Sequence, residues 1–274
     1  MLRSTLSLRF GGAAVFIFSL VGFSLSSNAH TAWILPTTMY LGDFGSVSFD
    51  AAISKSAFEA DQLPLRLDSL KILAPDGSTV RPFNVNMMRR RGVFDAMFDQ
   101  VGTHRVAITT FELGANWLNA NARASGVTSD QPSEVLSKVP RTATAVKMYE
   151  RIDRSETFVV VGKPSAVTPI GIGLELGLDG GVPVMPEGQK SRFVLFLDGR
   201  PIINSSVTVT RGGSLRGSNI QRYVTDSNGE FVVSWPGAGF YLLESRMADQ
   251  QSKLPEVKER RLYYAATLQV TMGK

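Results

Sequence analysis

Residues 156–164 of this chain are Glu156-Thr157-Phe158-Val159-Val160-Val161-Gly162-Lys163-Pro164. The first six predict a β-strand, because β-branched and aromatic side chains favour the extended backbone. The glycine and proline that follow predict that the strand stops there, since proline cannot donate an amide hydrogen bond within a sheet. We therefore place a boundary between two domains directly after this strand, near residue 163.

The residues before this boundary predict a series of short strands. Apolar and polar residues alternate from Ser46 to Ile53, as they do in a strand with one buried face. Strand-like runs follow at 65–73, 93–98 and 104–110, with short turns between them. Several strands joined by short turns predict an antiparallel sandwich for residues 30–163.

Residues 116–141 interrupt this pattern. The segment is rich in Asn, Ala and Ser, contains Pro132 and Pro140, and has only Ser133–Val139 as a helix-compatible run. We expect a long surface excursion here, because long connections without regular strand patterns lie on the surface. Ala145–Ile152, which comes next, is compatible with a helix or a strand.

The residues after the boundary repeat the strand pattern. Strands are predicted at 193–197, 206–210, 221–225, 240–244 and 261–271. Asn228-Gly229 predicts a hairpin between 223–224 and 231–233, because both residues tolerate a positive φ angle. The sequence thus predicts an all-β chain with two antiparallel β-sandwich domains, immunoglobulin-like or transthyretin-like, at 30–163 and 164–274, and no long helix in either.

The first 29 residues have the three parts of a secretory signal peptide. Arg3 and Arg9 are positively charged, Gly11–Leu25 is apolar, and Ser27-Asn28-Ala29 provides small residues for cleavage after Ala29. The alternative is a membrane anchor, but the apolar run falls short of the ~20 residues that span a bilayer. We expect cleavage, a periplasmic protein, and no stable membrane insertion after the signal is removed.

Composition limits the other function classes. The chain has no cysteine, which excludes disulfides and thiolate metal sites. Its formal net charge is +5, or +3 without the two arginines of the signal, and Arg89-Arg90-Arg91 is the sharpest basic cluster. We expect no nucleic-acid partner, because stacking aromatics do not interleave with these arginines. A solvated hairpin tip is the simplest interpretation of the cluster, and contact with an anionic envelope surface is an alternative.

Enzyme signatures are absent from the sequence. Asp226-Ser227-Asn228-Gly229 resembles the start of a calcium loop, but Gly237 stands where the loop needs a glutamate. Asp95 and Asp99 have the spacing of an acid and base pair, yet charged residues at the end of a strand need no catalytic reason. No Gly-x-Ser-x-Gly motif accompanies the serines. We expect a protein that is not an enzyme.

Several segments together resemble a family of unknown function from the bacterial periplasm. They are His30–Pro36, Pro64–Asp68, Ala74–Gly77, Gly102-Thr103, Glu156–Phe158 with Gly162–Pro164, Thr225–Phe231 and Lys258–Leu262. Members are often labelled as the periplasmic component of a cobalt or nickel uptake system. The second half is also similar to carboxypeptidase-regulatory and transthyretin-like sandwiches. The chain departs from the family at His104, where members more often have Tyr, and near Gln62, where they more often have His.

The only two histidines are the candidate metal ligands. Cleavage after Ala29 would leave His30 with a free α-amine beside its imidazole, and His104 could add a third nitrogen. Such a site suits Cu(II), Ni(II) or Co(II). The alternative for His104 is a packing role at a sheet corner, where another aromatic ring would serve equally well.

Two functions remain open from the sequence. One is a periplasmic protein that binds or relays nickel, cobalt or copper for an uptake system, with a metal-uptake transporter or an outer-membrane receptor as its partner. The other is an envelope binding or scaffolding module that recognises a protein or a glycan. Metal-dependent stability would separate them, because a ligand that binds only the folded state raises its melting temperature.

Overall fold

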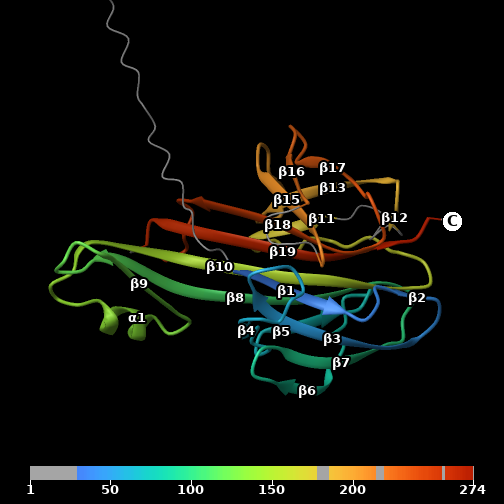
Figure 1. The fold of residues 1–274 in the computed structure, drawn as a ribbon, viewed down its shortest axis with the longest axis horizontal. Coiled ribbons are helices and arrows are strands. Elements are labelled where there is room, and N and C mark those ends of the chain that lie inside the picture. The colour runs from blue at the N-terminus through green and yellow to red at the C-terminus, as the bar shows by residue number, and fades with distance from the viewer. Residues whose placement is uncertain (1–29, 178–184, 214–218, 255–256, 274) are drawn as a thin grey trace, which may run out of the picture.

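The computed structural model describes residues 30–177, 185–213, 219–254 and 257–273. Within these ranges the chain is all-β, with nineteen strands and one short helix (Figure 1). No helix in the same ranges has the length and apolar character needed to cross a bilayer. The predicted signal segment, residues 1–29, lies outside the described residues.

The strands form three sheets. The N-terminal sheet contains β1 (Thr31–Pro36), β3 (Gly45–Ser54), β7 (Gly92–Phe98), β6 (Phe83–Met87) and β4 (Leu63–Pro64). The middle sheet contains β16 (Ile220–Val224), β15 (Ser206–Arg211), β18 (Gly239–Asp249), β19 (Glu259–Thr271), β10 (Thr144–Val161), β8 (Gly102–Leu118), β5 (Leu70–Leu73), β2 (Tyr40–Leu41), β9 (Ala124–Ser129) and β12 (Met185–Pro186). The C-terminal sheet contains β11 (Leu174–Gly177), β13 (Lys190–Leu197), β14 (Arg200–Pro201) and β17 (Glu230–Ser234).

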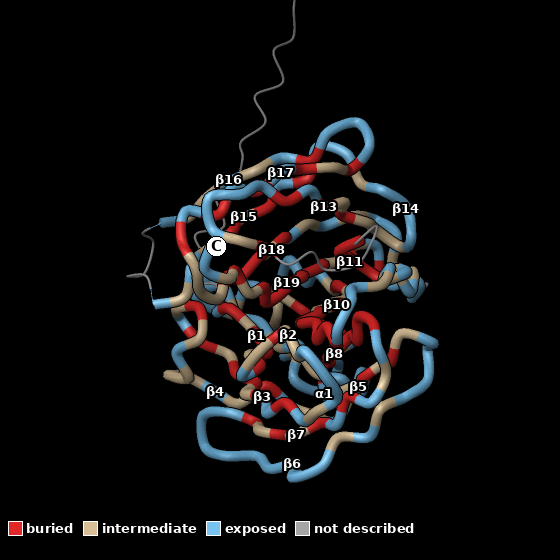
Figure 2. Tube along the Cα trace, turned by 90° about the vertical axis from the view of Figure 1, so that its right-hand side faces the viewer, coloured by how far each residue is buried: buried red, intermediate tan, exposed pale blue. Residues whose placement is uncertain are grey.

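The middle sheet lies between the other two, and strand β10 ends in four successive apolar residues, Phe158 to Val161, that are all buried. Successive side chains of a strand point to opposite faces. Val159 and Val161 therefore pack in the core under the N-terminal sheet, while Phe158 and Val160 pack in the core under the C-terminal sheet. This end of β10 is covered on both faces, so its apolar residues follow one another without alternation. Figure 2 shows this buried layer between the two exposed outer edges.

The predicted fold class is confirmed, since each half forms an antiparallel sandwich. Strands β5, β8 and β10 face the N-terminal sheet, and β15, β16, β18 and β19 face the C-terminal sheet. The two sandwiches share the middle sheet, because β10 pairs in parallel with β19 from Tyr149 opposite Glu259 to Thr157 opposite Thr267. The division at residue 163 falls directly after β10; whether the halves are separate domains stays a prediction.

Five buried polar side chains, which we call the junction cluster, lie where the sandwiches meet: Arg105, Arg154, Glu156, Glu175 and Tyr264. Arg154 Nε donates to Glu156 Oε2 at 2.9 Å, and Arg105 Nε lies 3.3 Å from the same oxygen. Arg105 Nη1 lies 3.5 Å from Glu175 Oε2, and Tyr264 donates its hydroxyl to Glu156. Two positive and two negative charges thus compensate one another away from water.

Glu175 also fixes the linker between the sandwiches. Its carboxylate accepts hydrogen bonds from the backbone N–H groups of Ile170, Gly171 and Ile172 at 2.8, 2.6 and 3.1 Å. Arg105 donates to the carbonyl of Thr168 at 3.0 Å in the same segment. The junction cluster therefore holds the linker as well as the two sheets.

The excursion predicted at 116–141 takes the form of an arm. Strands β8 and β10 pair from Gly102 opposite Val161 out to Leu118 opposite Thr144, and the far part of this ribbon extends to the left in Figure 1. Helix α1 (Pro132–Lys138) forms where a short helix was expected, and the ambiguous segment 145–152 is strand. Strand β9, which the sequence did not predict, pairs with β8. The arm has its own small core of Leu113, Ala115, Trp117, Val135 and Val257.

The turn predicted at Asn228-Gly229 forms, but the predicted hairpin is wrong. Asp226 Oδ1 accepts the amide N–H groups of Asn228 and Glu230 at 2.8 and 2.9 Å, and Gly229 has a φ of +75°. However, β16 pairs with β15 of the middle sheet, whereas β17 pairs with β13 of the C-terminal sheet. The turn instead connects the two sheets of the sandwich, because the apolar side chains of β17 enter the core from the side opposite β15.

Candidate functional site

His104 lies inside the N-terminal sandwich. Its side chain is fully buried, and its ring meets the ring of Phe98 edge-on with 4.9 Å between the centroids. Burial lowers the pKa of the imidazole, since the charged form loses its hydration. The structure therefore places His104 in the packing position of an aromatic residue.

His30 is exposed and directly precedes β1. Its carbonyl oxygen accepts a hydrogen bond from Arg246 Nη2 at 3.3 Å, and the guanidinium carbon of Arg246 lies 4.2 Å from the centroid of the Tyr263 ring. The next residue, Thr31, donates to Glu244 Oε1 at 2.7 Å. The beginning of β1 is thus attached to β18 and β19, while the His30 side chain is exposed.

The two histidines are not brought together. Thr31 pairs with Ser54 at one end of β3, and Gly45 at the other end pairs with Phe98, which contacts His104. A strand rises about 3.3 Å per residue, so the two ends of β3 are roughly 30 Å apart. Among the described residues, no three His, Asp or Glu side chains are grouped as metal ligands. The three-nitrogen site considered from the sequence does not form in this geometry.

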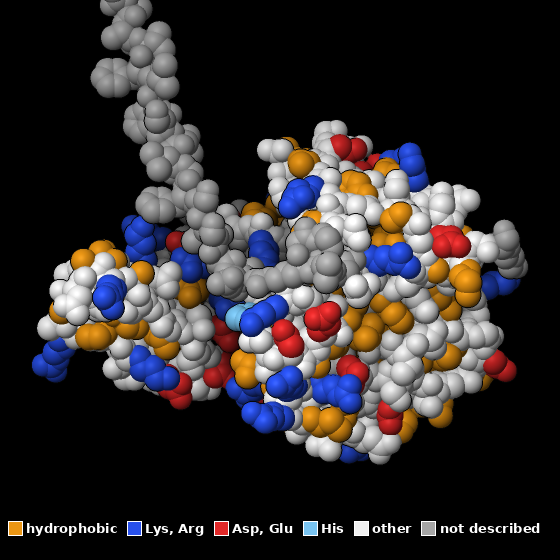
Figure 3. Space-filling view, in the orientation of Figure 1, with side chains coloured by type: hydrophobic (Ala, Val, Ile, Leu, Met, Phe, Trp, Pro, Cys, Tyr) orange, Lys and Arg blue, Asp and Glu red, His pale blue; other side chains and the backbone are white. Residues whose placement is uncertain are grey.

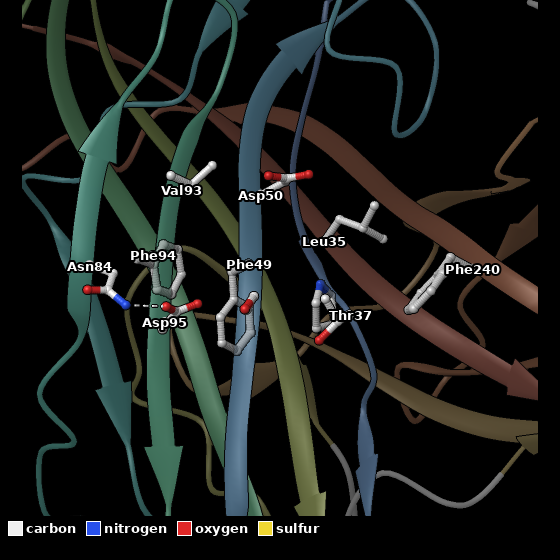
Figure 4. Close-up of a pocket in the computed structure, with 11 residues that line it drawn as sticks. Leu35, Thr37, Phe49, Asp50, Asn84, Val93, Phe94, Asp95 and Phe240 are labelled. Carbon is white, nitrogen blue, oxygen red and sulfur yellow. Dashed lines mark hydrogen bonds between the residues drawn. The ribbon is translucent and has the colours of Figure 1, made fainter.

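A groove on the outer face of the N-terminal sheet is a candidate binding site. It encloses about 420 Å³ between β3, β7 and the side of β18 (Figure 4). Its apolar walls include Leu35, Val93 and Phe240, so both sandwiches contribute to it. The groove exists because β3 and β7 alternate, with their apolar residues facing the core and their polar residues facing outward.

Two aspartates lie along this groove, one on each strand. Asp50 pairs with Val93 and Ser48 with Asp95, so the two aspartates are diagonal neighbours, a relation that separates residues by about 7–8 Å. Asn84 Nδ2 donates to Asp95 Oδ2 at 2.7 Å, and Arg91 Nη1 lies 3.1 Å from Asp50 Oδ2. Figure 4 shows both carboxylates on the open side of the sheet.

The surroundings of Asp95 favour its charged form. Hydrogen bonds from Ser48 and Asn84 hold the pKa of this carboxyl below its usual range. A general acid needs the opposite shift, because it must carry a proton near neutral pH. The groove therefore offers fixed hydrogen-bond acceptors and negative charge between apolar walls, which is the chemistry of binding.

The sequence singled out Asp95, but for a different partner. Asp99 lies beyond the end of β7, whereas Asp50 and Asn84 share the groove with Asp95. The alternation in 46–53 and 93–98 indicates that Asp50 and Asp95 face outward. Their proximity depends on the register between β3 and β7, which no local pattern specifies.

Comparison with solved structures gives weak likenesses at low identity. The D0–D1 domain of intimin is 13% identical, with 87% of this chain and 97% of that chain covered and a TM-score of 0.22. FdeC, an Escherichia coli adhesin, is 13% identical, with coverages of 89% and 66% and a TM-score of 0.21. The human OSCAR ligand-binding domain is 14% identical, with coverages of 88% and 98% and a TM-score of 0.20. Scores of this size carry no argument about what the chain binds.

Sequence comparison identifies a family but not an activity. No curated protein matches the chain. One family model matches residues 27–249, which include the N-terminal sheet, the arm and most of the second sandwich. The chain therefore belongs to the family described as Domain of unknown function (DUF4198).

Proposed function

We propose that this protein is a non-enzymatic binding module of the bacterial envelope, and that it holds a protein or glycan partner in the β3–β7 groove. The observation that carries the proposal is the combination of two carboxylates, Asp50 and Asp95, with apolar walls in one open hollow. Binding sites generally combine apolar surface with a few converging polar groups that set orientation. The envelope location rests on the signal features of residues 1–29.

The groove suits a ligand that donates hydrogen bonds. Asp50 and Asp95 accept hydrogen bonds from hydroxyl, amide or ammonium groups, and Thr37 adds a hydroxyl at the β1 side. Phe240 and Leu35 provide apolar surface for a sugar ring or an aliphatic stem. A partner such as an outer-membrane receptor or an uptake transporter would meet these groups without any change in the two cores, because the groove lies on the outer face of its sheet.

Photocrosslinking from inside the groove tests this function. A photoreactive residue replaces Val93, which lies opposite Asp50, and the protein is irradiated in the envelope of producing cells. The expected result is a discrete adduct whose yield falls in the Asp50→Asn, Asp95→Asn background. Digestion with protease or glycosidase then distinguishes a protein partner from a glycan.

The matched control places the same residue at Val232. Val232 is exposed on β17 of the C-terminal sheet, far along the chain from the groove. No adduct at Val93, or the same adducts at both positions, would contradict binding in the groove. If the adduct yield at Val93 is the same with and without the two Asp→Asn changes, the carboxylates do not take part in binding.

Metal relay remains a second proposal, in which the metal site consists of His30 and the amino terminus alone. Exposed His30 favours it, since its imidazole and a newly formed α-amine would both reach solvent. His104 has no part in this version, because it lies in the core at the far end of β3. Nickel, cobalt or copper would then be held by a surface chelate, and the uptake system would be the acceptor.

A further inference from the structure

We propose that the β6–β7 turn docks on an anionic phospholipid surface. We call this turn, Met87-Met88-Arg89-Arg90-Arg91, the arginine tip. The tip residues do not line the groove, although Arg91 of the tip pairs with Asp50 at its rim. It adds a membrane-facing surface to the binding module.

The arginine tip is a tight turn at the edge of the N-terminal sheet. The amide of Met88 donates to the carbonyl of Arg91 at 2.8 Å, which closes the turn between β6 and β7. Strand β6 pairs only with β7 and is exposed along its whole length. In Figures 1 and 2, β6 lies at the end of the molecule opposite β16 and β17, so the C-terminal sandwich does not obstruct this edge.

Most of the positive charge at this edge is not neutralised by the protein. Arg91 pairs with Asp50 at 3.1 Å. Arg89 and Arg90 are exposed and form no ion pair with any residue in the described ranges. Each arginine near an anionic leaflet contributes about 1 kcal/mol to binding. The two free arginines of the tip therefore complement the negative charge of phosphate headgroups.

Apolar side chains accompany these arginines on the same edge. Met87 and Met88 are each 45% exposed in the tip, and Phe83 on the edge strand β6 is 42% exposed. Figure 3 shows Lys or Arg side chains beside hydrophobic ones over the lower edge, where Figure 1 places β6 and β7. Basic residues interleaved with apolar ones are the composition of surfaces that lie in the headgroup region of a bilayer.

The shape of the edge favours a lipid surface over an acidic peptide. A peptide is held by a groove or along the edge of a sheet, and its specificity comes from pockets for its side chains. The arginine tip is a projecting turn, so its methionines and arginines can meet a planar surface together. Flexible methionine side chains adapt to such a surface without a fixed complementary shape.

Vesicle flotation with the protein purified after export tests the proposal. The probes are vesicles of phosphatidylglycerol with phosphatidylethanolamine and vesicles of phosphatidylcholine alone, at low and high salt. We expect binding to the anionic vesicles only. Arg89→Ser with Arg90→Ser should weaken it about 30-fold, from about 1 kcal/mol per arginine. Met87→Ser with Met88→Ser should remove the part of the binding that survives high salt, since salt screens charge but not apolar contact.

The matched control is Arg200→Ser with Arg222→Ser, which removes the same charge from exposed positions in the C-terminal sandwich. It should leave vesicle binding unchanged, and both double variants should keep the melting temperature of the parent. Equal loss in the two double variants would overturn the proposal in favour of net charge alone. Failure to bind anionic vesicles would also overturn it. Displacement from vesicles by polyglutamate together with insensitivity to the methionine changes would assign the tip to an acidic protein instead.

Discussion

Glu156 and Glu175 of the junction cluster, and Asp50 and Asp95 of the groove, are two acidic pairs with opposite surroundings. The glutamates are fully buried, and arginines, a tyrosine and backbone amides occupy their oxygens. The aspartates lie on an open face, where Ser48 and Asn84 contact Asp95 and Arg91 contacts Asp50. The comparison teaches that an acid with its acceptor sites filled stabilises the fold, whereas one that faces solvent is available to a ligand.

Glu156→Gln should have the largest effect on stability. It leaves Arg105 and Arg154 with one buried carboxylate between them, and breaking a buried ion pair costs about 3–5 kcal/mol. Urea unfolding of the parent and variant measures the difference. An effect below about 1 kcal/mol would show that the two acidic pairs do not differ as proposed.

Acid titration sharpens the same contrast. Burial alone would raise the pKa of Glu156, but Arg105, Arg154 and Tyr264 lower it on balance. A carboxyl with a lowered folded pKa contributes stability above its unfolded pKa of about 4.3 and loses it as the pH falls toward the folded pKa. The parent should therefore lose stability below about pH 4.3 more steeply than Glu156→Gln. Parallel curves of unfolding free energy against pH for the two proteins would contradict this assignment.

Gly229→Val separates a backbone effect from a charge effect. A Cβ at this position would lie 2.9 Å from Pro201 Cβ and 3.0 Å from the Leu195 carbonyl oxygen, and the φ of +75° disfavours a β-branched residue. We expect a loss of about 1–3 kcal/mol that does not change with pH between 3 and 7. Asn228→Ala is the control, and it should be nearly neutral because only Gly229 of the two has a positive φ. Equal melting temperatures for Gly229→Val and the parent would refute the turn geometry.

The sequence predicts single strands and turns better than their partners. Alternation identified β3 and β15, whose inward valines, Val47, Val207 and Val209, are buried as their pattern indicates. The turn at 226–229 was also predicted, but its strands separate, since Phe231 packs against β13 rather than continuing beside β16. Local residues determine a turn, whereas the choice of neighbouring strand depends on the whole core.

The candidate site was less accessible to sequence reasoning than the fold. His104 has the sequence signature of a ligand, yet Phe98 and the core around it make it a packing residue. The groove depends on Asp50 and Asp95 coming from strands that are about 45 residues apart in the chain, and on Phe240 arriving from the other sandwich. The residues Glu156 to Val161 predicted the end of β10 as a strand, but nothing in them names β19 as its neighbour.

The groove aspartates should contribute little to stability. Asp50→Asn with Asp95→Asn keeps the shape of both side chains at partly exposed positions, so the unfolding free energy should change by no more than about 0.5 kcal/mol. Thermal unfolding of the double variant measures this directly. A large loss of unfolding free energy would show that Asp50 and Asp95 are structural residues, like the acids of the junction cluster. The two acidic pairs would then not differ in role.

His30 should affect metal affinity and leave stability without metal unchanged. Isothermal titration with Cu(II) or Ni(II) compares the chain beginning at His30 with the same chain preceded by Gly-Ser, and the free α-amine should bind more tightly. His30→Ala should abolish that difference. His104→Phe should leave the affinity unaltered, because His104 packs in the core. Equal affinities for the free and extended termini would eliminate the terminal chelate.

The parallel pairing of β10 with β19 has a consequence for the order of folding. Each paired residue of β10 finds its neighbour 110 positions later, as Tyr149 and Glu259 illustrate. Contacts so distant in sequence form slowly, because a long loop must close before they contribute. Until the last strand emerges during synthesis, Phe158 and Val160 have an uncovered side. The nascent chain thus carries an unpaired strand edge while the 110 residues that separate β10 from its β19 partners are made, and this is the period when a chaperone can bind it.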